Sequence, residues 1–438
     1  MSAVNRFIQR RVLPGVLPSL AGVSHPVLQR LYASRGVSCA TQLQRSASAL
    51  LPFTALKGIT DAVELLMSAL KQQQQLVIVG DFDADGATST AVLLTGLKAL
   101  GFKRVEYLVP NRFEYGYGLT PEMAELAVAQ GAELIITVDN GISAIDGVAL
   151  AKKAGVKVLV TDHHLAGTEL PDADAIVNPN QPGCSFPSKA LAGVGVAFYL
   201  LLALRAALRE QGYFSDAQAE PNLAELLDLV ALGTVADVVP LDANNRLLVS
   251  QGLARIRAGR CRPGITALFR VAERDPGRLV ASDLGFVVAP RLNAAGRLDD
   301  MSEGILCLLT DSPEQALRMA RELDALNQER RDIESGMQQE ALAALQALRL
   351  GDDQVPAGLV LYDRHWHQGV IGILAGRIKE RFHRPVIAFA PAQAPAYGEE
   401  PAELKGSARS IPGVHVRDVL DAVATRHPGL ITRFGGHA

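Results

Sequence analysis

Short apolar segments alternate with longer amphipathic segments along the first half of the chain. Segments rich in β-branched residues occur at 76–79, 105–109, 134–138 and 157–160, and each of the first three is followed by a helical pattern. Strands that alternate with helices in this way are typical of a parallel sheet with crossover helices. The pattern therefore predicts an α/β fold built on a parallel sheet.

The later part of the chain has a different pattern. Apolar residues recur at helical spacing from Pro313 to Leu350, with charged residues between them, which predicts one long amphipathic helix. A β-rich segment then begins at Leu359, and we interpret it as the start of a second, smaller domain. The uncharged segment from Ala190 to Leu204 is shorter than the roughly 20 residues that span a bilayer, so we expect a buried core helix there.

Acidic and imidazole side chains follow three of the predicted strands. They are Asp81, Asp83 and Asp85 after the first strand, Asp139 after the third, and Asp162, His163 and His164 after the fourth. Because the carboxyl ends of parallel strands meet at one edge of a sheet, we expect these side chains to converge. A calcium loop is disfavoured, since an EF-hand loop counted from Asp81 needs a glutamate at its twelfth position, which is Val92.

Asp237 is a further candidate, because it is the only charged residue in a largely apolar segment from Leu229 to Leu241. Taken alone, it is equally consistent with a helix cap or a buried hydrogen-bonded acid. Together with Asp83, Asp85, Asp139 and His163 it provides enough oxygen and nitrogen ligands for two magnesium or manganese ions. Two such ions are typical of phosphoester hydrolysis, and the chain has no phosphate loop, HExxH or GxSxG motif.

The composition is that of a globular protein with two or three domains, since the chain has 438 residues, 48% of them hydrophobic. The net charge of −3 does not indicate a nucleic-acid partner, but residues 252–278 hold seven arginines against two acids. That segment is either a phosphate-attracting patch or a solvated face. The four cysteines form no CxxC pair and the first residues lack a signal-peptide pattern, so we expect a cytoplasmic protein without membrane association. The segment GVGVAF at Gly193 lacks the GxGxxG pattern, and we interpret it as a close helix contact.

Four segments, DFDADG, TVDNG, TDHH and GTVADVVPL, resemble in order and spacing the motifs of the DHH phosphoesterase superfamily. The segments APRLNAAGRLDDM, HQGVIGILAGRIKERFHRPVI, LKGSARSI and FGGHA resemble its RecJ branch and the accessory domain of that branch. The resemblance runs from about Leu31 to the last residue. It implies a parallel-sheet DHH catalytic domain joined by a long helix to a smaller α/β accessory domain of the DHHA1 type.

The resemblance also implies an activity and a domain order. The expected activity is a 5′ to 3′ exonuclease that degrades single-stranded DNA to 5′-mononucleotides with two Mn²⁺ or Mg²⁺ ions, in recombination and repair. The expected parts are an N-terminal extension (1–60), the catalytic domain (61–300), the connecting helix (301–352) and the accessory domain (353–438). Members of the branch continue into an oligonucleotide-binding fold, so we expect this chain, which ends at Ala438, to be truncated within the accessory domain.

The motifs assign roles residue by residue. The resemblance implies that Asp83, Asp85, His163 and Asp237 are metal ligands, that Asp139 bridges the ions in catalysis, and that His164 supports the site or contacts the scissile phosphate. Asp81 ligates either directly or through water. The expected contacts to the DNA are Arg112, Tyr115, Arg291, Asn293, Arg297, Ser407, Arg409 and His437, with Phe113 and Tyr117 as further stacking surfaces and Ser407 and Arg409 in a pocket for the 5′-phosphate.

The expected partners are single-stranded DNA with a 5′ end, a single-strand-binding protein and a helicase, with the enzyme acting as a monomer. Two other functions are considered. A hydrolase of small phosphates, such as pyrophosphate, cyclic dinucleotides or short oligonucleotides, uses the same motifs. A catalytically inactive DNA-binding relative is disfavoured, because such relatives lack the motif acids that this chain has.

Overall fold

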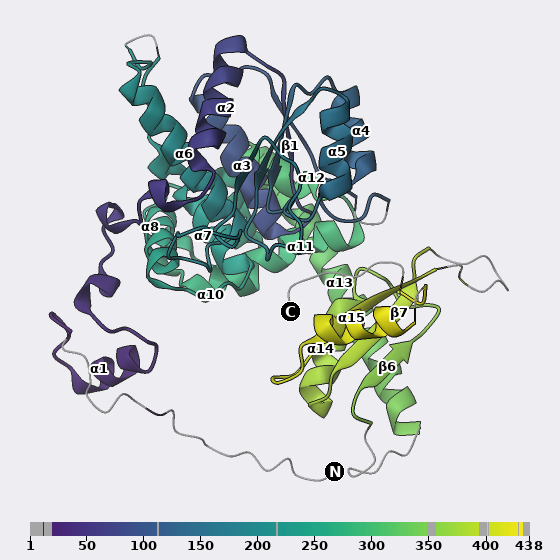
Figure 1. Ribbon diagram of the computed structural model, residues 1–438. Coiled ribbons are helices and arrows are strands. Elements are labelled where there is room, and N and C mark those ends of the chain that lie inside the picture. The colour runs from purple at the N-terminus through teal and green to yellow at the C-terminus, as the bar shows by residue number, and fades with distance from the viewer. Residues whose placement is uncertain are drawn as a thin grey trace.

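The computed structural model describes Val12 and residues 20–111, 114–215, 218–347, 356–393, 401, 403–427 and 429–431. Figure 1 shows a large α/β domain and a smaller one, connected by the long helix α13 (Pro313–Ala347). The predicted fold class and the predicted long helix are thus confirmed. Among the described residues, no helix is both long enough and apolar enough to cross a membrane.

The large domain is built on a five-stranded sheet in the order β2-β1-β3-β4-β5. The strands are β1 (Leu76–Val79), β2 (Val105–Leu108), β3 (Leu134–Val138), β4 (Lys157–Thr161) and β5 (Ala175–Val177). All four pairings are parallel, with Val79 opposite Thr137 and Val138 opposite Thr161. The carboxyl ends of β1, β3 and β4 therefore lie side by side at one edge of the sheet.

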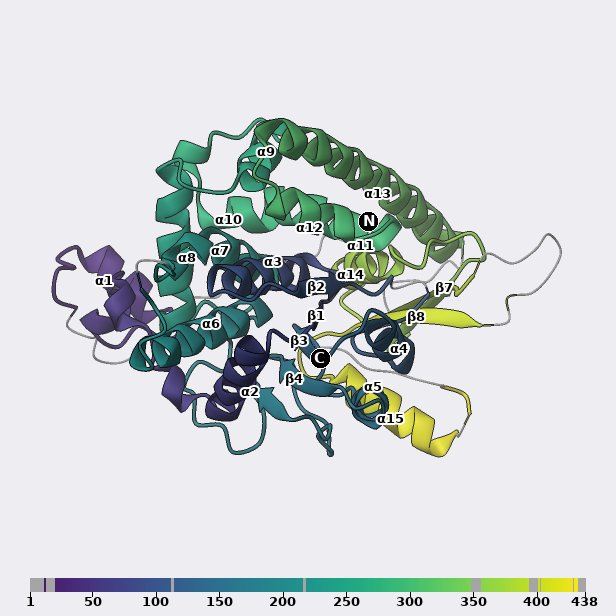
Figure 2. The ribbon, with the colours of Figure 1, turned by 90° about the horizontal axis from the view of Figure 1, so that it is seen from above.

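Helices cover both faces of this sheet, which explains why its central strands are apolar throughout. The helices are α2 (Ile59–Gln72), α3 (Ala84–Ala99) and α6 (Gly193–Glu210) on one face, and α4 (Pro121–Ala129) and α5 (Ile145–Lys153) on the other, as Figure 2 shows. Leu76 and Ile78 of β1 pack toward the first set of helices, and Val77 and Val79 toward the second. The predicted core helix in the apolar segment at 190–204 is confirmed as α6.

A layer of shorter helices extends the core beyond α3 and α6. These elements are η4 (Leu223–Leu226), α7 (Leu227–Ala236), α8 (Ala243–Arg257), α9 (Pro263–Val271), η5 (Pro276–Arg278), α10 (Ala281–Asp283), the π-helical turn η6 (Leu284–Val288), α11 (Ala289–Leu298) and α12 (Ser302–Leu309). Two arginines of the basic segment at 252–278 are used inside this layer. Arg262 forms an ion pair with the buried Asp228 at 2.9 Å, and Arg257 Nε donates to Leu279 O. Attraction of phosphate by the other arginines stays a prediction.

Helix α13 packs against both domains. Ala316, Ala320 and Leu323, in its first half, belong to the core of the large domain. Met337 and Ala341, in its second half, belong to a separate core formed with the small domain. The elements of that domain are β6 (Leu359–Tyr362), α14 (Ile371–Phe382), β7 (Val386–Pro391), β8 (Leu404–Arg409) and α15 (Val416–Arg426), with the strand order β6-β7-β8. One helix thus joins two cores.

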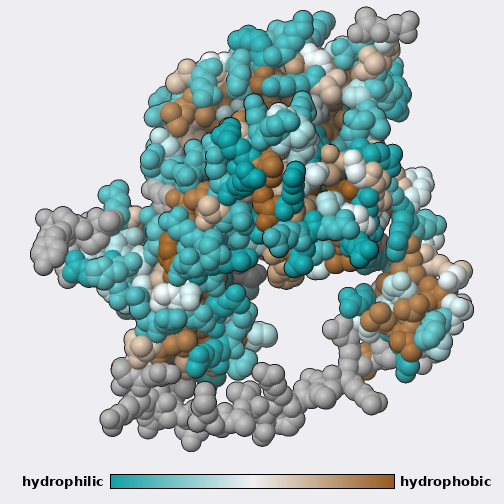
Figure 3. Space-filling view, turned by 180° about the vertical axis from the view of Figure 1, so that it is seen from behind, coloured by the Kyte–Doolittle hydropathy of each residue, from teal (hydrophilic) through white to brown (hydrophobic). Residues whose placement is uncertain are grey.

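The N-terminal segment packs on the outside of the large domain. Its elements are α1 (Pro26–Ala33), η1 (Ala40–Leu43), η2 (Ala47–Ala49) and η3 (Phe53–Ala55). Arg246 donates to Gln42 O, and Leu51 N donates to Asn244 Oδ1, which ties this segment to α8. Figure 3 shows apolar residues exposed on the part that carries α1. The domain boundaries given above stay predictions.

Candidate metal centre

The loop between β1 and α3 carries the first three acids. Asp83 is the N-cap of α3, and its Oδ1 accepts hydrogen bonds from Asp85 N at 2.9 Å and Gly86 N at 3.0 Å. Asp81 Oδ1 accepts from Phe82 N at 2.7 Å. A Cβ at position 86 would lie 2.5 Å from Asp81 O, so only glycine lets the chain turn this tightly. The local fold therefore presents three carboxylates at the carboxyl end of β1.

Asp85 is held by the N-terminus of α6. Its Oδ2 accepts from Gly193 N at 2.7 Å and its Oδ1 from Val194 N at 3.0 Å, where the helix offers unpaired N–H groups and the positive end of its dipole. Burial and the charge of Asp83 nevertheless raise the pKa of Asp85 to about 7, because the two hydrogen bonds only partly offset them. A cation beside this carboxylate would favour its ionised form.

Asp139 follows β3 with a left-handed backbone, at a φ of 62°. Such a conformation is uncommon outside glycine and is often found at functional sites. Its side chain is buried, and its Oδ1 accepts no hydrogen bond from the described residues. Burial and the charges of Asp85 and other nearby acids raise the pKa of Asp139 well above its ordinary value. Oδ1 therefore has no hydrogen bond from the described residues that would stabilise its charge, and a metal ion would stabilise that charge.

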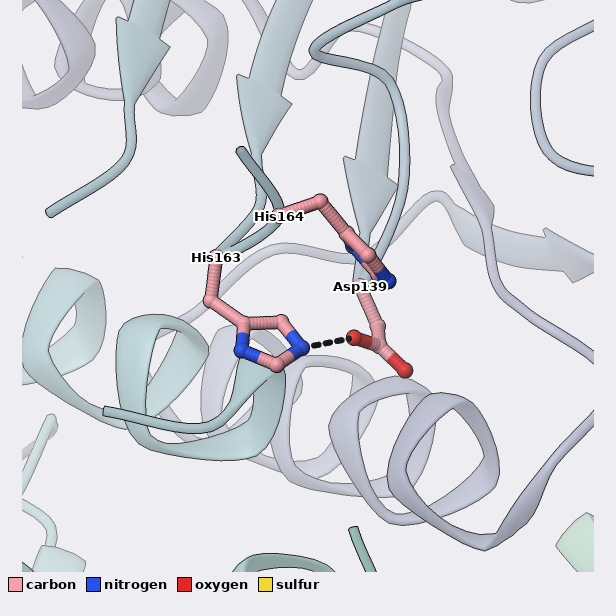
Figure 4. Close-up of side chains that lie close together, drawn as sticks. All are labelled: Asp139, His163 and His164. Atoms are coloured by element: carbon pink, nitrogen blue, oxygen red, sulfur yellow. Dashed lines mark ion pairs between the residues drawn. The ribbon is translucent and has the colours of Figure 1, made fainter. Parts of the chain in front are cut away.

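His163, which follows β4, brings the acids together. Its Nε2 lies 3.1 Å from Asp139 Oδ1, the pair drawn in Figure 4, 3.4 Å from Asp237 Oδ2 and 4.0 Å from Asp85 Oδ2. Asp237 is the C-cap of α7, and burial followed by the charge of Asp85 raises its pKa to about 9. The predicted convergence of these residues is thus seen in the structure.

His164 lies beside this cluster and is oriented by Asp162. Its Nδ1 is 2.6 Å from Asp162 Oδ1, and the other oxygen of that buried carboxylate accepts from Ile142 N at 2.9 Å. Burial lowers the pKa of His164, but the hydrogen bond and the charge of Asp162 raise it by more. Nε2 of His164 is 3.3 Å from the hydroxyl of Tyr117, which donates to Asp139 O at 3.1 Å. A hydrogen-bonded chain therefore links the ring of His164 to the backbone of Asp139.

The donor atoms fit divalent ions that prefer oxygen and nitrogen. Three groups of side chains place one donor atom each within 4.8 Å of the others: Asp81 with Asp83 and Asp139, Asp85 with His163 and Asp237, and Asp139 with His163 and His164. Asp139 occurs in two groups, as expected if its carboxylate bridges neighbouring ions. The absence of thiolates and the buried, unsatisfied oxygen of Asp139 both suit Mn²⁺ or Mg²⁺.

The residues predicted to contact DNA are placed in different surroundings. Arg112 and His437, as well as Phe113, lie outside the described residues. Tyr115 is half-buried against the core between the sheet and helices α4 and α5. Tyr117 is closer to the metal ligands than the sequence indicated, and its ring meets that of Phe82 edge to face at 5.8 Å.

Two of the three residues predicted on α11 have structural partners within the large domain. Arg291 is 9% exposed, pairs with Asp324 Oδ1 at 2.8 Å and donates to Val287 O, so it joins α11 to α13. Asn293 Oδ1 accepts from Ala84 N at 2.8 Å and thereby fixes the first turn of α3. These contacts are internal packing contacts that the sequence did not predict, and contact of either side chain with phosphate stays a prediction.

Arg297, Ser407 and Arg409 lie at the small domain. Arg297 Nη1 donates to Gly369 O at 3.2 Å across the domain boundary. Ser407 and Arg409 lie on β8 next to the first turn of α14, where a Cβ at position 372 would be 2.9 Å from Ser407 Oγ and 3.1 Å from Arg409 Nη2. A hydroxyl, a guanidinium and a helix N-terminus thus come together, which is a combination suited to a phosphate group. Their contact with a 5′-phosphate stays a prediction.

Comparison with known proteins agrees with these features. Residues 75–234 match the model of the DHH family, N-terminal domain, and residues 356–438 match the DHHA1 domain. The single-stranded-DNA-specific exonuclease RecJ of Salmonella typhimurium is 60% identical over 427 residues, which cover 97% of this chain and 72% of that protein. RecJ of Escherichia coli is 59% identical over the same shares of both chains.

Solved structures show the same likeness. RecJ from Thermus thermophilus in complex with Mn²⁺ matches with a TM-score of 0.73 and 34% identity, over 93% of this chain and 54% of that one. An exonuclease RecJ bound to manganese matches with a TM-score of 0.71 and 35% identity, over 88% of this chain and 90% of that one. This chain spans about half of the Thermus chain. With its DHH and DHHA1 domains and its cluster of acids and imidazoles, the chain belongs to the RecJ family of single-stranded-DNA-specific exonucleases.

Proposed function

We propose that this chain hydrolyses single-stranded DNA from its 5′ end and releases 5′-mononucleotides, with two Mn²⁺ or Mg²⁺ ions at the carboxyl edge of the sheet. One observation carries the proposal. Asp85, Asp139, His163 and Asp237 come from four separate segments and place donor atoms around a single imidazole nitrogen. Similar proteins are named single-stranded-DNA-specific exonucleases, and a related RecJ was solved in complex with Mn²⁺.

The ligands would be Asp81, Asp83, Asp85, Asp139, His163 and Asp237. Divalent ions held by them would neutralise charge on the scissile phosphate and lower the pKa of a bound water. The protein fixes the ligands through its backbone: α6 orients Asp85, and the left-handed turn after β3 presents Asp139. His164, held by Asp162 and lying beside Asp139 in Figure 4, would contact the scissile phosphate.

The small domain would bind the end of the strand. The side chains of Ser407 and Arg409 lie at the first turn of α14, where backbone N–H groups and the helix dipole favour an anion. A terminal phosphate presents several acceptor oxygens to such donors, whereas a 5′-hydroxyl does not. This arrangement supports a preference for strands with a 5′-phosphate.

The metal assignment is tested by digestion of a labelled single strand in Mn²⁺ or Mg²⁺. Asp139→Ala should lower the rate by about 100-fold or more, since even the groups that only support a metal ligand contribute about 10 to 100-fold. Asp146→Ala, which removes an exposed acid of α5, should leave the rate unchanged. An Asp139→Ala variant that degrades DNA at the wild-type rate would show the assignment to be wrong. Cleavage of dinucleotides or pyrophosphate, with long strands left intact, would favour a hydrolase of small phosphates instead.

The phosphate pocket is tested with paired substrates that carry either a 5′-phosphate or a 5′-hydroxyl. Arg409→Ala should bring the ratio of the two cleavage rates closer to one, because the guanidinium recognises only the phosphorylated end. Arg426→Ala, at the exposed end of α15, is the matched control and should keep the wild-type ratio. Equal discrimination by Arg409→Ala and wild type would remove Arg409 from the pocket.

The remaining parts of the proposal rest on the resemblance to the family. They are that the chain acts as a monomer in the cytoplasm, in recombination and repair, together with a single-strand-binding protein and a helicase. Size-exclusion chromatography with light scattering measures the first of these, and a mass of twice 46.6 kDa would contradict it.

A further inference from the structure

Phe286 is an exposed aromatic residue in a turn that packs against the end of α7, the helix whose C-cap is Asp237. Its side chain is 80% exposed, whereas every other phenylalanine that the structure describes is buried or half-buried. It lies in the π-helical turn η6, between α10 and α11. Single π-helical turns are rare, and they occur frequently at functional sites.

The turn is fixed firmly against the end of α7. Leu284 and Val288 are fully buried on either side of Phe286. Gly285 faces α7, where a Cβ would lie 3.1 Å from Val235 Cγ1 and 3.4 Å from Val235 O. The exposure of Phe286 is therefore a property of a well-packed turn rather than of a loose loop.

Val238 brings a second apolar side chain to the same place. Val238 directly follows the proposed metal ligand Asp237 in the sequence. The N–H of Val238 donates to Val235 O, which is the carbonyl that faces Gly285. Val238 has a φ of 60° and is 84% exposed. A left-handed backbone is a genuine outlier for a β-branched residue, and such strain is often found at functional sites. Two exposed apolar side chains thus project from neighbouring backbones next to the metal centre.

Helix α11 directly follows the turn that contains Phe286, and it packs against the loop between β1 and α3. In α11, Asn293 accepts from Ala84 N, and Gly296 packs directly against the carbonyl of Phe82. Figure 1 shows α11 on the side of the large domain next to the small domain. A strand that lies along α11 with its phosphates at the proposed ligands would bring its bases toward η6, which directly precedes α11, and toward the end of α7.

We propose that Phe286 and Val238 form an apolar ledge that holds an unstacked base of the single strand beside the metal centre. This inference rests on the function proposed above. A nucleobase is the occupant that fits, because it is flat and apolar on its faces and belongs to the substrate that the adjoining site binds. Bases stack on aromatic side chains regardless of sequence. Bases in a duplex are already stacked on one another, so the ledge also favours single strands.

The test is a comparison of normal and abasic single strands, with binding measured by fluorescence anisotropy in an Asp139→Asn background that prevents degradation. Phe286→Ala should weaken binding of the normal strand by about 5-fold to 100-fold, the range measured when one stacking side chain is removed. It should leave binding of the abasic strand unchanged, because that strand has no base to stack. Phe286→Trp should restore the affinity for the normal strand.

Two controls make the result specific. Val360→Ala removes a side chain that is 70% exposed on β6 and should leave both affinities unchanged. The thermal midpoint of Phe286→Ala should equal that of the parent, since its ring is already exposed. Equal weakening for normal and abasic strands, or none for either, would overturn the ledge. A wild-type protein that does not degrade single-stranded DNA in Mn²⁺ would instead overturn the proposed function, which separates the two failures.

Discussion

Gly193, at the first turn of α6, packs directly against the carboxylate of Asp139. A Cβ there would lie 2.6 Å from Asp139 Oδ1 and 2.8 Å from Asp139 Cγ, about 1 Å closer than ordinary van der Waals contact. In Gly193→Ala, either Asp139 or the helix must therefore move by close to 1 Å. Movement of the helix would also lengthen the two hydrogen bonds that hold Asp85. A displacement of that size can lower a rate by about 100-fold, and we expect a loss of at least that factor in kcat.

The assay is steady-state digestion of a 5′-phosphorylated single strand over a range of Mn²⁺ concentrations. Because the substitution disturbs two ligands, we expect a higher Mn²⁺ requirement as well as a lower kcat, with little change in KM for DNA. Gly195→Ala is the matched control in the same helix, since the atoms nearest to its Cβ belong to the side chain of Leu191 and not to a proposed metal ligand. If Gly193→Ala kept the wild-type kcat and Mn²⁺ dependence, the argument that α6 positions the carboxylates would be refuted.

Three further predictions concern the same surroundings. Mn²⁺ should raise the thermal midpoint of the wild type but not of Asp139→Asn, because an ion stabilises the charged form of acids whose pKa values are raised by burial and by mutual repulsion; equal shifts in calorimetry would contradict this. Asn293→Ala should lower kcat by about 10-fold with DNA affinity unchanged, since it removes the acceptor for Ala84 N; a loss of affinity alone would indicate a phosphate contact. Arg291→Ala should lower the free energy of unfolding by about 1 to 2 kcal/mol in urea titrations, because it removes the ion pair with the partly exposed Asp324 and the hydrogen bond to Val287 O; unchanged stability would contradict a structural role.

The sequence was sufficient to predict the sheet and the convergence of most of the proposed metal ligands. The reason is local: β-branched runs such as Leu76–Val79 specify buried strands, and a parallel sheet brings the residues after each strand to one edge. Asp81 and Asp139 follow their strands within two residues, so the positions of the strands determine the positions of these two acids. Asp237 was harder, because it ends a helix rather than a strand, and its place beside His163 depends on how α7 packs.

The features that the sequence did not reveal depend on long-range geometry. Asp85 and the N–H of Gly193 are 108 residues apart, and nothing in the segment GVGVAF distinguishes a helix that packs closely from one that also binds a carboxylate. The π-helical turn at Phe286 has the apolar spacing of an ordinary helix, so its exposed ring was not predicted. The structural partners of Arg291 and Asn293, which are Asp324 and Ala84, lie in other elements, so the sequence did not reveal them.

Because α13 is one continuous helix, the number of residues between its contacts with the two cores determines how the two domains are oriented relative to each other. Leu323 is packed in one core and Met337 in the other, about 20 Å further along the axis at 1.5 Å per residue. Inserting one residue between them would turn the core of the small domain by about 100° and pull Gly369 away from Arg297. Inserting seven residues would nearly restore the direction of that core but would move the core about 10 Å along the helix axis. The length of this helix thus sets both the distance and the angle between the metal centre and the 5′-phosphate pocket that we propose on β8.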